Sequence, residues 1–120
     1  MTTLLNVPRA EWRTFFDRMS KGLLGKRAEI EVASLELGDQ IVAEWVPLLG
    51  ITYDSADDLV DVALDHANHL IRRPKEILAD VNATGLTSVA IVDQDGTRQV
   101  VRLKEALMLP PASASSAVQH

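Results

Sequence analysis

The fold of this chain is decided by residues 48–65, which read LLGITYDSADDLVDVALD. Apolar and polar residues alternate on both sides of a central run of aspartate, serine and alanine at residues 54–58. Alternation with a period of two is typical of a strand with one buried face. Asp and Ser favour turns, because their side chains bond nearby backbone N–H groups. We therefore predict a β-hairpin in an antiparallel sheet that is covered on one side.

A helix is predicted upstream, at about residues 8–20. Its apolar residues fall at positions i, i+3, i+4 and i+7, which places them on one helical face: Trp12, Phe15, Phe16 and Met19. This stripe holds both phenylalanines of the chain and one of its two tryptophans. We interpret it as the face that packs on the sheet and fills the core, rather than as an exposed recognition face.

Further strands are predicted where the alternation continues, at residues 26–37, 40–46, 76–82, 87–92 and 97–103. A bulge near residues 33–35 is expected to return Leu35 and Leu37 to the interior. Pro47 is expected to end or bend its strand, because proline lacks the N–H that a ladder needs. Residues 66–74 are predicted to be an irregular connection or a helical turn. Residues 104–109 either continue the last strand or form one helical turn.

One helix followed by strands with short turns predicts an α+β fold. An N-terminal amphipathic helix would pack on a curved, mainly antiparallel sheet of about six to seven strands, arranged as a meander or a small barrel-like roll. A doubly wound parallel sheet is excluded, because no crossover helices separate the strands. Residues 1–109 are expected to form a single domain, and residues 110–120, PPASASSAVQH, a disordered tail.

The composition restricts the possible functions of this 120-residue chain. It contains no cysteine, which excludes disulfides, thiolate zinc sites and cysteine nucleophiles. The formal net charge of −5 disfavours nucleic acid as the main partner. No apolar run reaches the roughly 18 residues of a membrane span, and the N-terminus lacks a signal-peptide pattern. These features predict a cytoplasmic protein that does not enter a membrane.

Two groups of polar residues are candidates for a metal or acid–base site. His66 and His69 are three residues apart beside Asp65, a spacing that brings two imidazoles together only on a helix. Five aspartates within residues 54–65 form an acidic strip, but they lack the spacing of a calcium loop. The chain also has no G-x-S-x-G motif and no glycine-rich phosphate loop. We therefore predict solvated side chains, no catalysis and no cofactor, with a small-molecule or metal pocket near the histidines as the weakest alternative.

A small basic cluster surrounds Pro74 and consists of Arg72, Arg73 and Lys75. It could contact a phosphate or an acidic partner, and more cations would join it if the fold brought further loops close: Lys21, Lys26 and Arg27. Nucleic-acid binders commonly interleave aromatic side chains for stacking, and none lies near this cluster. We interpret it first as a balance to the acidic strip.

Four segments resemble the bacterial domain of unknown function 5335 family: PRAEWRTFFDRMS (residues 8–20), LLGITYD (48–54), HLIRRPKEI (69–77) and GLTSVAIVDQDGT (85–97). Their order and spacing carry the resemblance, which covers most of the chain apart from the tail. The resemblance implies no activity, no cofactor and no catalytic residue.

The sequence therefore predicts a non-enzymatic protein-interaction or structural module that could pair with itself as a homodimer. A small sheet with exposed edges often pairs with another copy or a peptide. The alternative is binding of nucleic acid or a phospholigand through Arg72, Arg73 and Lys75, on a barrel like those of Sm or SH3 domains. That alternative is based only on an analogy of element order.

Overall fold

The computed structural model describes residues 3–23 and 25–108. The N-terminal part comprises β1 (Thr3–Asn6), the short 3-10 helix η1 (Arg9–Glu11) and α1 (Trp12–Lys21). Seven strands follow: β2 (Arg27–Ser34), β3 (Gly38–Asp54), β4 (Leu59–Leu64), β5 (Ala67–Arg72), β6 (Pro74–Asn82), β7 (Gly85–Asp93) and β8 (Arg98–Leu107). Together the strands form an antiparallel sheet in the order β1-β6-β7-β8-β2-β3-β4-β5. The mainly antiparallel sheet with one α-helix is confirmed, but it has eight strands rather than six or seven.

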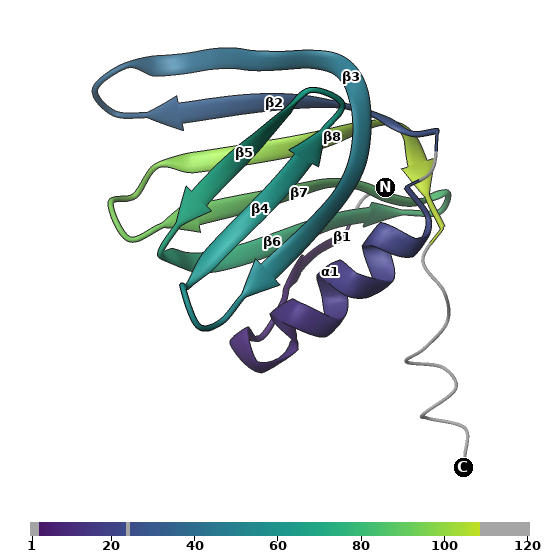
Figure 1. Ribbon diagram of the computed structural model, residues 1–120, viewed down its shortest axis with the longest axis horizontal. Helices are drawn as coiled ribbons and strands as arrows, with labels where there is room; N and C mark the ends of the chain where they lie inside the picture. The colour runs from purple at the N-terminus through teal and green to yellow at the C-terminus, as the bar shows by residue number, and fades with distance from the viewer. Residues whose placement is uncertain (1–2, 24, 109–120) are drawn as a thin grey trace.

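The sheet folds over into two layers because β3 belongs to both. Residues 38–47 of β3 pair with β2, and residues 48–54 pair with β4. Figure 1 shows β3 curving between the layers, so that β4 and β5 cross in front of β6, β7 and β8. The predicted strand end at Pro47 is wrong, because β3 continues through this residue and changes its pairing partner there. The alternative prediction, a bend, agrees with the curvature of β3 between the layers. The described sheet remains open, with β1 and β5 as its two edges, and does not close into a barrel.

The core lies between the layers, and α1 packs along β3 to close it. The structure buries the whole predicted helical stripe: Trp12, Phe15, Phe16 and Met19. Ser20 anchors the helix to the strand, because its Oγ donates to the carbonyl of Ile51 at 2.7 Å and accepts from the Ile51 N–H at 3.0 Å. Within residues 3–23 and 25–108, no helix has the length and apolar character needed to cross a membrane.

Residues 66–74 are not the irregular connection that the sequence predicts. β5 occupies Ala67–Arg72 and pairs with β4 along its whole length, without a shift in register. The alternation is weak there because β5 is an edge strand, and most of its side chains are exposed. The N-terminal segment, for which no strand is predicted from the sequence, likewise contains the edge strand β1, which pairs with β6.

The bulge expected near residues 33–35 is also wrong. Residues 35–37 form the turn between β2 and β3, and both Leu35 and Leu37 point into solvent. The irregularities in this pairing come earlier, between Ala28 and Glu31 of β2. Residues 104–107 continue β8, which was one of the two predicted possibilities. The expected tail at residues 110–120 lies outside the described residues.

Candidate functional site

The two histidines do not share a site. His66 lies in the β4–β5 turn, and its exposed Nδ1 is 3.3 Å from Oδ2 of Asp65. His69 lies on β5, and its Nε2 is hydrogen-bonded to Oε1 of Gln99, a buried residue of β8. His69 therefore connects the layer that contains β4 and β5, called the upper layer, to the layer that contains β6, β7 and β8, called the lower layer. No three His, Asp or Glu residues converge as metal ligands in the part of the chain that the structure describes.

The basic cluster is split between different backbone environments. Arg72 ends β5 with an exposed side chain, and Lys75 is exposed on β6. Arg73, between the strands, has a positive φ of 51°, and its N–H donates to the carbonyl of Asp58 at 2.8 Å. Its Nη2 is 3.7 Å from Oδ2 of Asp95. Arg73 thus connects the β5–β6 turn to the β3–β4 turn through Asp58, and to the β7–β8 turn through Asp95.

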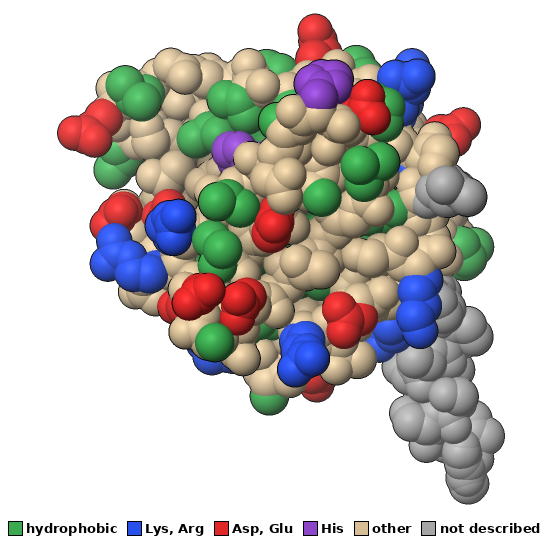
Figure 2. Space-filling model, viewed as in Figure 1, with side chains coloured by type: hydrophobic (Ala, Val, Ile, Leu, Met, Phe, Trp, Pro, Cys, Tyr) green, Lys and Arg blue, Asp and Glu red, His purple; other side chains and the backbone are tan. Residues whose placement is uncertain are grey.

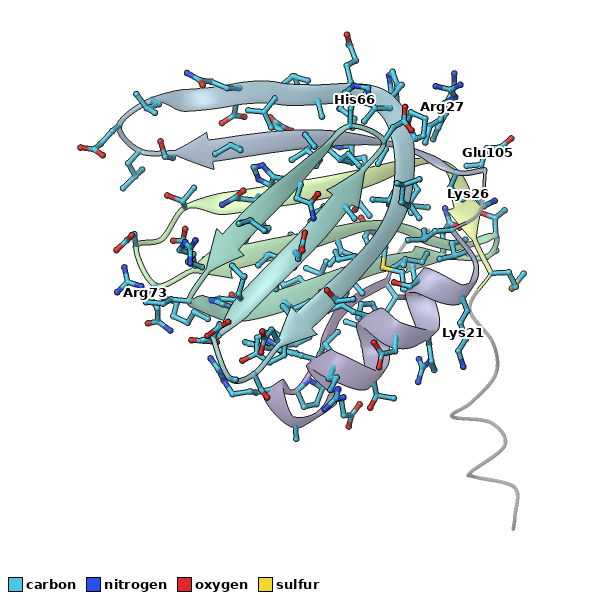
Figure 3. The ribbon with its side chains drawn as sticks, viewed as in Figure 1. Lys21, Lys26, Arg27, His66, Arg73 and Glu105 are labelled. Atoms are coloured by element: carbon cyan, nitrogen blue, oxygen red, sulfur yellow. The ribbon has the colours of Figure 1, made fainter. Side chains whose placement is uncertain are left out.

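The fold does not bring the other predicted cations to this cluster. Figure 3 shows Arg73 at one end of the long axis of the molecule, with Lys21, Lys26 and Arg27 toward the other. A joint phosphate site made from both sets is therefore not formed within one copy of the chain.

The acidic strip is used mainly for local structure. Asp54 caps its own turn, because its Oδ1 accepts the N–H groups of Ala56 at 2.9 Å and Asp57 at 3.3 Å. Asp61 accepts from the side-chain amide of Asn68 at 2.8 Å across β4 and β5. These carboxylates lie on the surface and do not form a catalytic pair.

Sequence reasoning missed a polar network at the start of α1. Arg9 donates through Nη1 to the phenol of Tyr53 at 3.1 Å, and through Nη2 to the carbonyl of Pro74 at 2.9 Å. The Arg9 guanidinium also stacks 4.3 Å from the ring centroid of Trp12. A pocket of about 290 Å³ opens beside Arg9 and Trp12 and extends to Lys75 and Glu76. No local motif announces this network, since its partners are 44 and 65 residues apart in the sequence.

The most unusual surface is a hairpin that extends beyond the two-layer core. We call residues 31–46 the arm; they comprise the end of β2, the β2–β3 turn and the first half of β3. None of these residues is buried. In Figure 1 the arm projects past β5, at the upper left of the view. One inward-facing row of side chains in the lower layer shows where the upper layer stops covering it. Followed from β6 to β3, this row consists of Ile77, Ile91, Gln99, Val32 and Gln40. The first three are buried, Val32 is half-buried and Gln40 is exposed.

The arm also lies within a segment whose charged side chains are all acidic, with histidine counted as neutral. Residues 28–71 contain no lysine or arginine, so all 12 of these residues lie outside the segment. The segment carries ten acidic residues: Glu29, Glu31, Glu36, Asp39, Glu44, Asp54, Asp57, Asp58, Asp61 and Asp65. This asymmetry is visible in the sequence alone, and it is the signal that could have directed attention to the arm.

Comparison with known proteins identifies relatives without adding a ligand or an activity. The model of a family of unknown function, DUF5335, matches residues 3–112. An uncharacterised protein of Aquifex aeolicus (strain VF5) is 38% identical over 105 residues, which cover 87% of this chain and 95% of the relative. No solved structure matches the chain significantly.

Proposed function

The chain belongs to the family of unknown function DUF5335, as the resemblance of its four segments predicts, and from this premise we propose that it is a non-catalytic protein-interaction module that binds through its arm. The observation that carries this proposal is the exposure of apolar side chains on the arm. Leu35 is fully exposed at 106%, Leu37 is 70% exposed, and two neighbours on β3 are about half exposed: Ile41 at 49% and Val42 at 51%. These exposed apolar side chains lie on both faces of one hairpin, and an accumulation of exposed apolar surface commonly marks an interaction site.

The backbone of the arm supports the same function. Residues 38–46 of β3 pair with β2 along one edge, and the other edge has no partner strand among the described residues. An unpaired edge offers N–H and C=O groups to an incoming strand. The arm therefore combines free backbone groups with apolar side chains.

A non-catalytic role is favoured because the polar groups that could perform chemistry have structural partners. Tyr53 and Asp58 bond to Arg9, Asp61 bonds to Asn68, and His69 bonds to Gln99. Each of these contacts joins two elements of the fold. The hydroxyl of Tyr53 lies beside the carboxylate of Asp58, but Arg9 is hydrogen-bonded to both groups.

Phospholigand binding through Arg72, Arg73 and Lys75 is the second candidate. Its support is the exposure of all three side chains at one end of the molecule. The contact between Arg73 and Asp95 reduces the positive charge available there. Binding of a phosphate-rich polymer that weakens with salt, and is lost in Arg72→Glu with Lys75→Glu, would support this candidate over the arm.

A photo-crosslinking amino acid placed at Leu37 tests the proposed function. In cells that produce the protein, we expect crosslinks from this position to another polypeptide. Leu49 is the matched control, because it is also an exposed leucine of β3, at 60%, but lies outside the arm. Equal crosslinking at both positions, or none at Leu37, would overturn the proposal.

A further inference from the structure

We propose that the partner of the arm is a second copy of this chain, whose basic end receives the acidic tip of the arm in a head-to-tail contact. The basic end consists of Lys21, Lys26, Arg27 and Lys104. This contact depends on the proposed function, because it names the polypeptide that binds the arm. Its two surfaces are complementary in charge and lie at opposite ends of one molecule.

The acidic surface is free to take a partner. Glu36, Asp39 and Glu44 are exposed on the arm, and none of them forms an ion pair with a Lys, Arg or His side chain in residues 3–23 and 25–108. Glu31, at the base of the arm, is already satisfied by Arg102, whose Nη1 lies 2.7 Å from its Oε1. Two of these carboxylates, Glu36 and Asp39, lie at the tip beside the β2–β3 turn, whereas Glu44 lies near the base of the arm.

The basic end also contains a carboxylate, Glu105, but its cations are not paired with it. Within the described part of the chain, none of its four cations forms an ion pair. Arg27 and Lys104 line a pocket of about 230 Å³ together with Gly25 and Glu105. A Cβ built on Gly25 would meet no described atom within 4 Å apart from its chain neighbours, so nothing crowds this part of the pocket lining.

Apolar contact is available at both ends. Leu35 and Leu37 flank Glu36 at the tip of the arm. At the basic end Met108 is 71% exposed, directly after Leu107, whose side chain lies against Gly22 at the end of α1. A leucine from the arm could cover Met108 while Glu36 meets the cations, as in an interface with an apolar centre and a charged rim.

The contact must form between molecules. Figures 1 and 3 show the β2–β3 turn and the residues Lys26 and Arg27 at opposite ends of the long axis of the view, so the tip of the arm cannot reach the basic end of its own chain. The base of the arm does contact that end, where Nη1 of Arg27 donates to the carbonyl of Trp45 at 3.1 Å. Figure 2 shows acidic side chains at the left extremity of this face with basic ones just below them, and both basic and acidic side chains along its right side. A head-to-tail contact uses two different surfaces, and it generates a ring or an open chain of copies.

Sedimentation velocity on the purified full-length chain tests this proposal through charge reversal. The arm variant carries Glu36→Lys with Asp39→Lys, and the end variant carries Lys26→Glu with Lys104→Glu. We expect the wild type to form concentration-dependent oligomers at low salt that dissociate at high salt, since exposed charges are screened. Each variant alone should associate at least about tenfold more weakly than the wild type, because like charges then face each other.

Association that returns when the two charge reversals are combined distinguishes a specific contact from a general effect of net charge. An equimolar mixture of the two variants should associate again, and so should a chain that carries all four substitutions. The control variant Asp57→Lys with Asp65→Lys makes the same change in net charge away from the arm, and it should associate like the wild type. Circular dichroism and urea unfolding check that every variant is folded.

Three outcomes would overturn the proposal. A wild type that stays monomeric at all concentrations and salt levels removes the second copy as partner. If Leu37 still crosslinks to a different protein in cells, the proposed function survives this result. Failure of the four-substitution chain to associate, or loss of association in the control variant, shows that oligomers form through another surface.

Discussion

The phenol of Tyr53 donates a hydrogen bond of 2.7 Å to Oδ1 of Asp58, across the acidic turn between β3 and β4. Arg9 contacts the same carboxylate at 3.4 Å and so links this turn to the start of the helical segment. Asp58 has a positive φ of 50°, and its carbonyl accepts the N–H of Arg73 at 2.8 Å. A strained turn residue is thus fixed from three directions, which makes Asp58 the point where the hairpin, the helix and the β5–β6 turn meet.

Removing the phenol oxygen should weaken this junction. We expect Tyr53→Phe to lower the free energy of unfolding by about 1.5 kcal/mol, because the bond is made to a charged acceptor in a largely buried place. Urea unfolding measures the loss. Asp58→Asn is the natural second variant, since asparagine tolerates a positive φ. A double-mutant cycle that shows no coupling between the two substitutions would contradict the role given to this bond.

The same network makes the stability of the protein fall in strong base. Burial, followed by the hydrogen bond to Asp58, raises the pKa of Tyr53 above its usual value of 10.0. The unfolded chain then loses the phenol proton at a lower pH than the folded chain does. The associated stabilisation is complete below pH 10.0 and is lost as the pH rises from there through the higher folded pKa.

Tyr53 is the only tyrosine of the chain, so its titration can be followed directly by phenolate absorbance. We expect a higher midpoint in the folded protein than in urea, and a smaller difference in Asp58→Asn. A folded midpoint equal to or below the unfolded one would disprove the shift.

The contact between His69 and Gln99 gives a third prediction. Gln99 is a buried polar residue, so removal of its partner leaves an amide without compensation. His69→Leu should therefore cost about 1–3 kcal/mol of unfolding free energy, whereas His69→Leu combined with Gln99→Leu should recover much of that loss. Urea unfolding of the wild type and these two variants decides this. Equal losses in His69→Leu and the double variant would show that packing, rather than the hydrogen bond, sets the cost.

Two glycines provide a matched test of backbone packing. Both have positive φ, 125° for Gly85 and 85° for Gly96, so alanine is strained at either position. A Cβ on Gly85 would lie 2.5 Å from the carbonyl oxygen of Leu107, whereas one on Gly96 would meet nothing within 4 Å. We expect losses of about 3 kcal/mol for Gly85→Ala and about 1 kcal/mol for Gly96→Ala. Thermal or urea unfolding that ranks them in reverse would contradict this packing.

The arm should contribute little to the stability of the fold. We expect Leu37→Lys to change the free energy of unfolding by less than about 0.5 kcal/mol, because the side chain is solvated. Leu48→Ala, farther along the same strand, should cost about 2–5 kcal/mol, because Leu48 is buried. Urea unfolding of both variants makes the comparison. A large loss in Leu37→Lys would mean that the tip of the arm packs within the chain.

Alternation predicted the core-facing side chains of regular strands well. Val60, Val62 and Val101 are all buried, because period-two burial is a local property that short windows of sequence record. Alternation could not show whether a second layer covers a given face. That is why Leu35 and Leu37 were expected inside, although the upper layer ends before it reaches them.

The missed strands and the missed network have a different physical cause. β1 and β5 are edges, where few side chains need to be apolar, so neither segment shows a clear period. The contacts of Arg9 with Tyr53 and Asp58 join residues 44 and 49 positions apart, and no local signal encodes such a meeting. The charge asymmetry of residues 28–71 could have been read from the sequence, but its meaning depends on the arm that the fold exposes.

The strand order has a consequence for how the protein is made. β2 can pair with β3, and β3 with β4, as soon as these strands leave the ribosome. By contrast, Thr3 of β1 must wait for Val81 of β6, and Ala28 of β2 must wait for Leu103 of β8. The apolar faces of the first strands therefore remain uncovered until β6 and β8 have been made. We expect the two-layer fold to form only after β8 has left the ribosome, because this strand joins β2 to β7.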